Sequence, residues 1–193
     1  MKKRILIGIS GASGAPIAVG VLRELQKYES VESHLIVTKA AELTLRQETG
    51  LSLEEVKEMA NCCYDNDSIG ARPASGSFRM EGMIIVPCSM KTVAGIVSGY
   101  SDNLLLRAAD VMLKERRKLL LVARESPLGT VHLRNLYEIS RMGAIVMPPM
   151  LTYYDHPQTL EDCTAHVVER IIQQFVVPTN AYEWEGTEQW DTK

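Results

Sequence analysis

The fold is decided by Gly8-Ile9-Ser10-Gly11-Ala12-Ser13-Gly14-Ala15-Pro16, a stretch that directly follows the apolar run Ile5-Leu6-Ile7. Residues 15–28 then carry apolar side chains at helical spacing. A buried strand that ends in glycine and serine and leads into a helix is typical of an anion-binding turn. Small residues let the backbone approach the anion, and the helix start offers N–H groups and a partial positive charge. The stretch therefore predicts a phosphate site between the first strand and the first helix.

This turn lacks the spacing of the dinucleotide-binding motif. Its glycines stand at 8, 11 and 14, a register that does not match G-x-G-x-x-G. The strand expected over 33–38 ends at Thr38-Lys39, where an NAD site requires an acidic residue for the ribose. A hydroxyl at this place suits a mononucleotide. These residues favour FMN over NAD as the phosphorylated cofactor.

Length, composition and charge argue against several classes of protein. The chain has 193 residues, of which 46% are hydrophobic, so we expect a single domain over 1–193. A net charge of -3 with interspersed signs argues against a nucleic-acid-binding surface. No apolar run is long enough to span a membrane, and Pro16 and Arg23 interrupt the pattern of a signal peptide. We therefore expect a cytoplasmic protein that binds neither nucleic acid nor membrane.

The cysteines give no sign of a disulfide framework or a metal centre. There are four of them, too few and too scattered for disulfide-stapled folds, which is consistent with a reducing compartment. Cys62 and Cys63 are adjacent rather than spaced as C-x-x-C, and no histidine lies near them in the sequence. We therefore expect buried thiols and no metal.

Strand and helix patterns alternate along the chain. Expected strands lie at 3–9, 33–38, 82–87, 117–123 and 143–147. Expected helices lie at 15–28, 39–48, 52–60, 90–98, 104–115, 130–142 and 159–175, with a long loop over 61–79. The strands are almost wholly apolar, which predicts a parallel sheet covered on both faces. The predicted fold class is α/β, a Rossmann-like doubly wound parallel sheet in a three-layer sandwich.

Polar residues gather where the expected strands end, which is where open α/β sheets bind ligands. The turn Ser89-Met90-Lys91-Thr92 follows the third strand and offers hydroxyls at a helix start, although Ser89 alone is equally typical of a helix cap. Arg124-Glu125 follows the fourth strand, and Tyr153-Tyr154 follows the fifth. None of these segments has the spacing of a metal site. They indicate anion binding by cations and backbone.

Over nearly its whole length the chain resembles the UbiX-type flavin prenyltransferases, which have the flavoprotein three-layer fold. Segments that resemble the family occur in the family's order. They are Gly11-Ala12-Ser13-Gly14-Ala15, Lys39-Ala40-Ala41, Glu48-Thr49, Ala74-Ser75-Gly76-Ser77, Pro87-Cys88-Ser89, Arg107-Ala108-Ala109-Asp110-Val111, Lys114-Glu115-Arg116, Arg124-Glu125-Ser126-Pro127, His132-Leu133, Met142-Gly143-Ala144, Tyr154, His156-Pro157, Val168 and Arg170. Ser77-Phe78-Arg79 and the turn from Cys88 to Thr92 resemble the subtype encoded beside hydroxyarylic-acid decarboxylases, the phenolic-acid decarboxylase small subunits.

The resemblance implies a reaction. The family uses reduced FMN and dimethylallyl monophosphate to build a fourth ring on the flavin through N5 and C6, which gives prenylated FMN for a UbiD-type aromatic-acid decarboxylase. Breaking the allylic C–O bond releases phosphate and leaves a carbocation, so fixed cations can stabilise the departing anion without a metal. The choice between a monophosphate and a pyrophosphate donor stays open, as does the aromatic acid of the partner enzyme.

The resemblance also implies roles for individual residues. FMN contacts fall on Gly11, Ala12, Ser13, Thr38, Ser89, Met90, Lys91, Thr92 and Arg124. Binding of the prenyl phosphate falls on Tyr154, Arg170 and Lys114, and catalytic roles fall on Glu48, Glu125, Lys114 and Arg107. Each charged residue taken alone is more typical of a solvated surface than of a site, such as Arg107 paired with Asp110 on a helix. We assign these roles because all of these residues occur together, in the order found in the family.

Two alternative functions stay open beside the prenyltransferase. One is a non-catalytic accessory subunit that binds FMN for a hydroxyarylic-acid decarboxylase. The other is an FMN-dependent cysteine-peptide decarboxylase of the same fold. That enzyme needs an asparagine where Gly76 stands and a histidine in the helix after the glycine turn, and no histidine lies between residues 8 and 33. The residues therefore disfavour the second alternative.

The C-terminal segment 176–193 suggests assembly. It carries Tyr182, Trp184 and Trp190 in an otherwise polar stretch, an aromatic surface that a monomer of this size has difficulty burying. The resemblance implies large symmetric homo-oligomers with active sites between subunits. We expect a homo-oligomer, a dodecamer by resemblance, with this tail packed on a neighbouring subunit.

Overall fold

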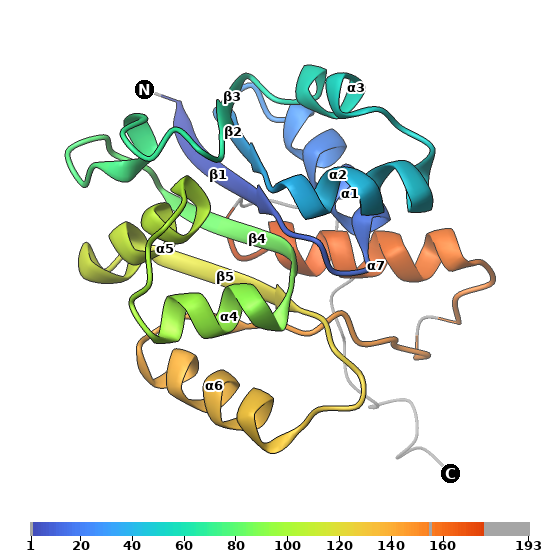
Figure 1. Cartoon of the computed structure of the whole chain (residues 1–193). Helices are drawn as coiled ribbons and strands as arrows, with labels where there is room; N and C mark the ends of the chain where they lie inside the picture. The colour runs from blue at the N-terminus through green and yellow to red at the C-terminus, as the bar shows by residue number, and fades with distance from the viewer. Residues whose placement is uncertain (1, 155, 176–193) are drawn as a thin grey trace, which may run out of the picture.

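The structure, a computed structural model, describes residues 2–154 and 156–175 and is built on a six-stranded parallel sheet (Figure 1). The strands are β1 (Lys3–Ile9), β2 (Val31–Val37), β3 (Cys62–Asp65), β4 (Gly82–Cys88), β5 (Lys118–Ala123) and β6 (Ile145–Val146). Their order in the sheet is β3-β2-β1-β4-β5-β6, so the winding reverses between β1 and β4. This order is that of doubly wound nucleotide-binding folds and confirms the predicted fold class.

Helices cover both faces of the sheet. They are α1 (Ala15–Gln26), α2 (Lys39–Thr49), α3 (Leu53–Glu58), α4 (Met90–Val97), α5 (Leu104–Lys114), α6 (Thr130–Arg141) and α7 (Leu160–Ile172), with a 3-10 turn η1 (Arg72–Ala74). One apolar core joins α1, α2, α3 and α7 to one face of the sheet, and a second core joins α4, α5 and α6 to the other face. Two cores separated by one sheet make the three-layer sandwich.

The central strands are buried along their length because both of their faces are covered. Every residue of β4 is buried, and its run Ile84-Ile85-Val86 is typical of such a strand. All strands run in the same direction, so their carboxyl ends meet at one side of the sheet, on the right in Figure 1. We call this side the carboxyl edge and the opposite side the amino edge.

The predicted loop 61–79 was wrong in part, because it contains β3 and η1. β3 is the outermost strand, and its residues alternate between half-buried and exposed. It has no β-branched residue, so the strand signal is weak. The pairing of β3 with β2 places Cys62 beside His34, although 27 residues separate them in the sequence. The expectation of buried thiols also fails at Cys63, which is exposed.

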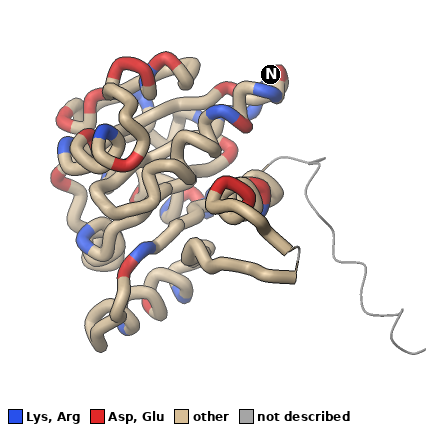
Figure 2. Tube along the Cα trace, turned by 90° about the vertical axis from the view of Figure 1, so that its right-hand side faces the viewer, with Lys and Arg blue, Asp and Glu red and all other residues tan. Residues whose placement is uncertain are grey.

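Figure 2 turns the molecule so that the carboxyl edge faces the viewer, and residues of both charge signs are interspersed there. Within residues 2–154 and 156–175, no helix combines the length and apolarity needed to cross a membrane. The predicted packing of 176–193 on a neighbour falls outside the described residues.

Candidate functional site

The turn between β1 and α1 requires glycine at two positions. A Cβ atom at Gly11 would lie 2.5 Å from the Cβ of Ala40, so the turn lies directly against the start of α2. Gly14 is the N-cap of α1 and has a φ of +119°, which other residues rarely adopt. These glycines hold Ala12 and Ser13 in a tight turn at the carboxyl edge.

The start of α1 is capped by a carboxylate from another helix. Oε2 of Glu48, near the end of α2, accepts hydrogen bonds from the backbone N–H groups of Gly14 (2.9 Å) and Ala15 (2.8 Å). Pro16 has no N–H group, and the N–H of Ile17 donates to the carbonyl of Gly14. The expectation that this helix start offers N–H groups to a phosphate is therefore corrected, because Glu48 already occupies them.

The Glu48 carboxyl is ionised at neutral pH. Burial raises its pKa, but hydrogen bonds from Gly14, Ser13 and Ala15 lower it. The positive charge of Arg124 lowers it further, and the pKa falls below its ordinary value. Arg124 follows β5 whereas Glu48 belongs to α2, so charges from distant parts of the chain meet here. An ionised carboxylate in this position can accept a proton.

A buried serine joins the ends of the two central strands. Ser10 is only 1% exposed, and its hydroxyl donates to the carbonyl of Pro87 (2.9 Å) and accepts from the N–H of Ser89 (2.8 Å). These bonds tie the glycine turn after β1 to the turn after β4. Ser10 was not among the predicted site residues. Its place as a hydroxyl residue at the very end of an apolar strand was the available signal.

Thr38 and Ser89 both act as helix caps. Thr38 Oγ1 accepts from a backbone N–H of α2 (3.3 Å), and Ser89 Oγ accepts from the N–H of Thr92 (3.3 Å). Ser89 Oγ also lies 3.0 Å from Thr92 Oγ1. Met90 and Lys91 are the first residues of α4, so their N–H groups have no partner within the helix. The backbone donors that suit an anion therefore lie at the start of α4 rather than of α1.

Arg124 and Glu125 complete the carboxyl edge at the end of β5. The N–H of Arg124 donates to the carbonyl of Cys88 (3.0 Å), which brings this segment beside the end of β4. Glu125 is exposed, and its Oε1 accepts from the N–H of Ser126 (3.0 Å). The predicted FMN residues thus lie together, at the ends of β1, β2, β4 and β5.

Lys114 lies far from this edge within the chain. It is the last residue of α5, and all six residues of β5 run between it and Arg124. At about 3.3 Å per residue, that strand spans about 20 Å. Lys114 Nζ donates to Glu115 Oε1 (2.7 Å) at the amino edge. The structure therefore does not bring Lys114 to the predicted FMN residues.

Arg107 is held on the same face of the sheet as Lys114. Its Nη1 donates to Asp110 Oδ2 (2.7 Å), the helical pair expected for a surface, and its Nε donates to the carbonyl of Ala74 (3.2 Å) in η1. The second contact connects α5 to the segment before β4. Arg107 therefore has a structural role within one chain, in addition to any role in binding a ligand.

Tyr154 and Arg170 lie on the opposite face, with α7. Tyr154 is exposed, and its hydroxyl lies 3.3 Å from Nε2 of His166. Arg170 lies in the last turn of α7, where its guanidinium contacts the side-chain oxygen of Gln173. The three residues predicted to bind the donor phosphate, Tyr154, Arg170 and Lys114, therefore occupy two faces of one chain and do not form a common site within it.

A groove of about 930 Å³ runs between α1 and α7 and ends at the glycine turn. Ser13 and Glu48 line its end, while Ile17 and Val168 are among the apolar side chains along it. The groove therefore joins the predicted catalytic acid to a largely apolar space.

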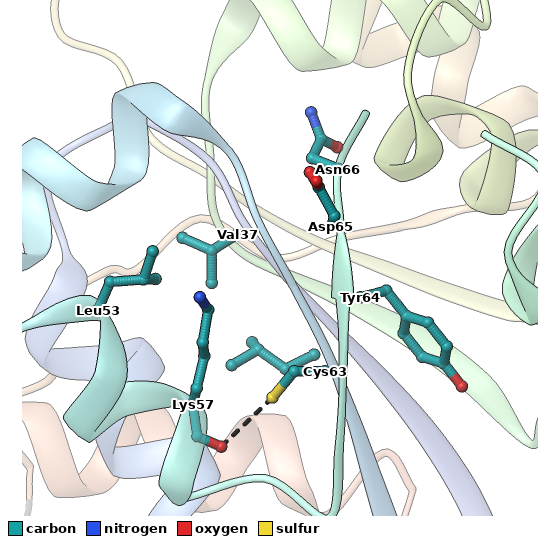
Figure 3. Close-up of a pocket in the computed structure, with 8 residues that line it drawn as sticks. Val37, Leu53, Lys57, Cys63, Tyr64, Asp65 and Asn66 are labelled. Carbon is teal, nitrogen blue, oxygen red and sulfur yellow. Dashed lines mark hydrogen bonds between the residues drawn. The ribbon is translucent and has the colours of Figure 1, made fainter. Parts of the chain in front are cut away.

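A second pocket of about 400 Å³ lies against β3, at the outer side of the sheet (Figure 3). Figure 3 shows Cys63 pointing toward Lys57, whose carbonyl accepts from the thiol at 3.3 Å, while Tyr64 points to the other side of the strand. None of the residues that line this pocket was a predicted site residue.

Known proteins resemble this chain in sequence and in fold. The flavoprotein family model matches residues 1–177. A probable UbiX-like flavin prenyltransferase of Streptomyces sp. (strain D7) is 49% identical over 184 residues, which cover 95% of this chain and 92% of the relative.

Two solved structures resemble nearly the whole chain. AnUbiX (PadA1), in complex with FMN and dimethylallyl pyrophosphate, gives a TM-score of 0.94 at 42% identity and covers 97% of this chain and 100% of its own. A dodecameric FMN-dependent UbiX-like decarboxylase from Escherichia coli O157:H7 gives a TM-score of 0.92 at 46% identity. The match covers 95% of this chain and 100% of the Escherichia coli chain. The chain therefore belongs to the flavoprotein family and, within it, to the UbiX-like flavin prenyltransferases.

Proposed function

We propose that this protein transfers the dimethylallyl group of dimethylallyl monophosphate to N5 and C6 of reduced FMN. The product, prenylated FMN, would serve a UbiD-type aromatic-acid decarboxylase. One observation supports the proposal most strongly. In a chain of the UbiX-like family, groups suited to binding an anion lie together at the ends of four strands, beside the ionised Glu48. The AnUbiX complex with FMN and an allylic pyrophosphate supports the same pair of ligand classes here.

The carboxyl edge suits FMN in shape and charge. Gly11 leaves no room for a side chain against Ala40, and this close-packed turn lets the backbone approach a ligand. The N–H groups of Met90 and Lys91 and the guanidinium of Arg124 are donors suited to a phosphate. Bound there, reduced FMN supplies an electron-rich ring system that can take up an allylic cation.

Departure of the donor phosphate requires cations, and we infer that two subunits supply them. As the allylic C–O bond breaks, negative charge grows on the phosphate, which Lys and Arg side chains stabilise. Within one chain Lys114 lies about 20 Å from Arg124 by strand length. A neighbouring copy in a homo-oligomer would bring Lys114, with Arg107, to the carboxyl edge. The dodecameric Escherichia coli relative supports such an assembly.

The carboxylates at this edge are proposed to accept and donate protons. Closing the fourth ring adds one proton to the double bond of the prenyl group and releases one proton from C6 of the flavin, and Glu48, which is ionised at neutral pH, is able to accept the released proton. Glu125 is exposed at the end of β5 and is the second carboxylate at this edge.

The test is the mass of the flavin. The purified protein is incubated anaerobically with reduced FMN and dimethylallyl monophosphate, and in parallel with the pyrophosphate, and the released flavin is weighed by mass spectrometry. We expect a gain of one isoprene unit, and the product should activate a UbiD-type decarboxylase. Bound FMN of unchanged mass with both donors would instead assign the role of a non-catalytic accessory subunit.

A further inference from the structure

Three metal-binding residue types meet on one face of the sheet, near its amino edge and outer strand. The β2–β3 register pairs His34 with Cys62, and Glu32 precedes His34 by two residues and so lies on the same face. One ligand atom from each of the three side chains lies within 4.8 Å of the other two. This cluster was not predicted, because β3 itself was not predicted from the sequence.

The imidazole of His34 is buried, and its Nε2 faces the Glu32 carboxylate. The side chain is 0% exposed, and Nδ1 lies 2.9 Å from the hydroxyl of Tyr64. Nε2 lies 3.0 Å from Glu32 Oε1, yet across residues 2–154 and 156–175 it has no hydrogen-bond partner. A buried polar atom without such a bond is costly and calls for an explanation. This nitrogen points to the carboxylate beside which a third ligand, the Cys62 sulfur, also lies.

We propose that Glu32, His34 and Cys62 form a binding site for a divalent transition metal of the zinc class. Tetrahedral zinc with bonds of about 2.0–2.3 Å separates its ligand atoms by roughly 3.3–3.6 Å. Here Nε2 and Oε1 are 3.0 Å apart, and Sγ and Oε1 are 3.9 Å apart. These two separations each lie within a few tenths of an ångström of the tetrahedral values, and all three ligand atoms lie within 4.8 Å of one another.

The surroundings of His34 fit a metal ligand. With a metal on Nε2, the proton resides on Nδ1, which then donates to the Tyr64 hydroxyl and fixes the ring, as outer partners of ligating histidines do. Glu32 and Cys62 are only partly buried, which gives a metal a path from solvent and leaves the fourth coordination position to water.

Arg4 limits the affinity of the site. Its Nε lies 3.6 Å from Glu32 Oε2, and its guanidinium lies over the Phe78 ring at 4.6 Å. The guanidinium repels an incoming cation and competes for the carboxylate. A thiolate, a carboxylate and a divalent ion sum to zero charge, so Arg4 does not prevent binding. Its replacement by an uncharged residue should tighten binding.

This site is separate from the flavin turns. His34 and Thr38 lie on one extended strand and its end, four residues or about 13 Å apart. The metal site therefore does not depend on the proposed prenyl transfer, and its test needs no flavin.

The experiment is a titration of the purified full-length protein, stripped of metal, with Co²⁺ as a spectroscopic substitute for zinc. We expect one equivalent to bind with a thiolate-to-cobalt charge-transfer band, and Zn²⁺ to displace it. Cys62→Ser should abolish the band. Cys63→Ser is the matched control, because Cys63 points to the opposite side of β3 toward Lys57 (Figure 3) and should leave the band unchanged.

Two further variants test the other contacts without removing the buried histidine. Glu32→Gln should weaken Co²⁺ binding at least about tenfold, and Arg4→Gln should strengthen it. Circular dichroism of each variant checks that the fold is kept. The proposal is overturned if the wild type shows no charge-transfer band, if the band persists in Cys62→Ser, or if Cys63→Ser removes it.

Discussion

Ser10 and Ser89 are hydrogen-bonded across the two central strands, with Ser10 Oγ 2.8 Å from the backbone nitrogen of Ser89. Ser10 follows the last residue of β1, and Ser89 is the N-cap of α4. The same hydroxyl donates to the carbonyl of Pro87, so its orientation is fixed. This one side chain therefore sets the spacing between the two turns proposed to hold FMN.

We predict that Ser10→Ala weakens FMN binding. The substitution leaves the N–H of Ser89 and the carbonyl of Pro87 short of a partner in a buried place, which costs about 1–3 kcal/mol of unfolding free energy. Loosening of the two turns should lower FMN affinity about fivefold, the equivalent of ~1 kcal/mol. Urea unfolding measures the first effect, and a flavin fluorescence titration measures the second.

Ser98→Ala is the control for this substitution. Ser98 also donates its hydroxyl to a backbone carbonyl, that of Gly95, but it is exposed at the far end of α4. It should change neither quantity appreciably. Equal FMN affinity of Ser10→Ala and the wild type would contradict the role given to Ser10.

We predict that Glu48 stabilises the fold in a pH-dependent way. Its pKa is below the ordinary value of 4.5 despite burial, because Gly14, Ser13 and Ala15 donate to it and Arg124 is near. The unfolded chain therefore binds the proton more tightly than the folded one. The stabilisation is fully present above about pH 4.5 and is lost as the pH falls through the lower, folded pKa.

Urea unfolding of the wild type and Glu48→Gln across this acidic range measures the effect. The difference in unfolding free energy should be largest near neutral pH and shrink as the solution becomes more acidic. Glu29→Gln, at an exposed position after α1, should show no such trend. A difference that grows toward acid would contradict the assignment. In activity assays, Glu48→Gln should slow turnover while sparing donor binding.

We predict that two inactive variants restore each other's activity. Lys114→Ala and Arg124→Ala should each lose most prenyl transfer, because each removes a cation from the proposed site. If Lys114 acts across a subunit interface, mixed oligomers contain some sites in which both residues are intact. Coexpression of the two variants should then give activity that neither shows alone.

Light scattering of the wild type checks the premise of this experiment. A monomeric mass at micromolar concentration would remove the basis for a shared site. If the mixed oligomers are inactive, Lys114 and Arg124 do not act together across a subunit interface, which contradicts the proposal.

Much of the fold follows from the sequence because its strands are apolar runs bounded by turn residues. β1 was predicted with its observed bounds, and α2 and α4 differ from the prediction by one residue at one end. β3 was missed because a short edge strand needs few apolar residues and its neighbour in the sheet supplies its hydrogen bonds. Predicted helix and strand patterns cannot reveal such a partner-dependent element.

The site was predictable in part for a related reason. Parallel strands bring their carboxyl ends together. The polar residues Thr38, Ser89 and Arg124, which follow three of these ends, therefore had to lie at one edge of the sheet. The cap that Glu48 places on α1 depends on how the end of α2 meets the glycine turn, which is a tertiary relationship. Likewise, the proximity of His34 and Cys62 depends on the register of the missed strand.

We predict that prenyl transfer proceeds without a divalent metal. In the proposed site the fixed charges of Arg107, Lys114 and Arg170 take the role that Mg²⁺ has in enzymes acting on pyrophosphates. Activity should therefore survive EDTA. It should also survive Cys62→Ser, because the proposed zinc-class site is about 13 Å along β2 from the flavin turns.

Arg170→Ala tests whether side-chain cations, rather than a metal, stabilise the departing phosphate. Loss of one cation that stabilises the departing phosphate should cut turnover about a hundredfold. FMN affinity should stay nearly unchanged, because Arg170 is in α7 and not among the strand ends that suit FMN. Arg141→Ala, at the end of α6 over the Tyr137 ring, is the matched arginine control and should keep turnover. Loss of activity on chelation, restored by Mg²⁺, would show that a metal rather than these side chains balances the phosphate charge.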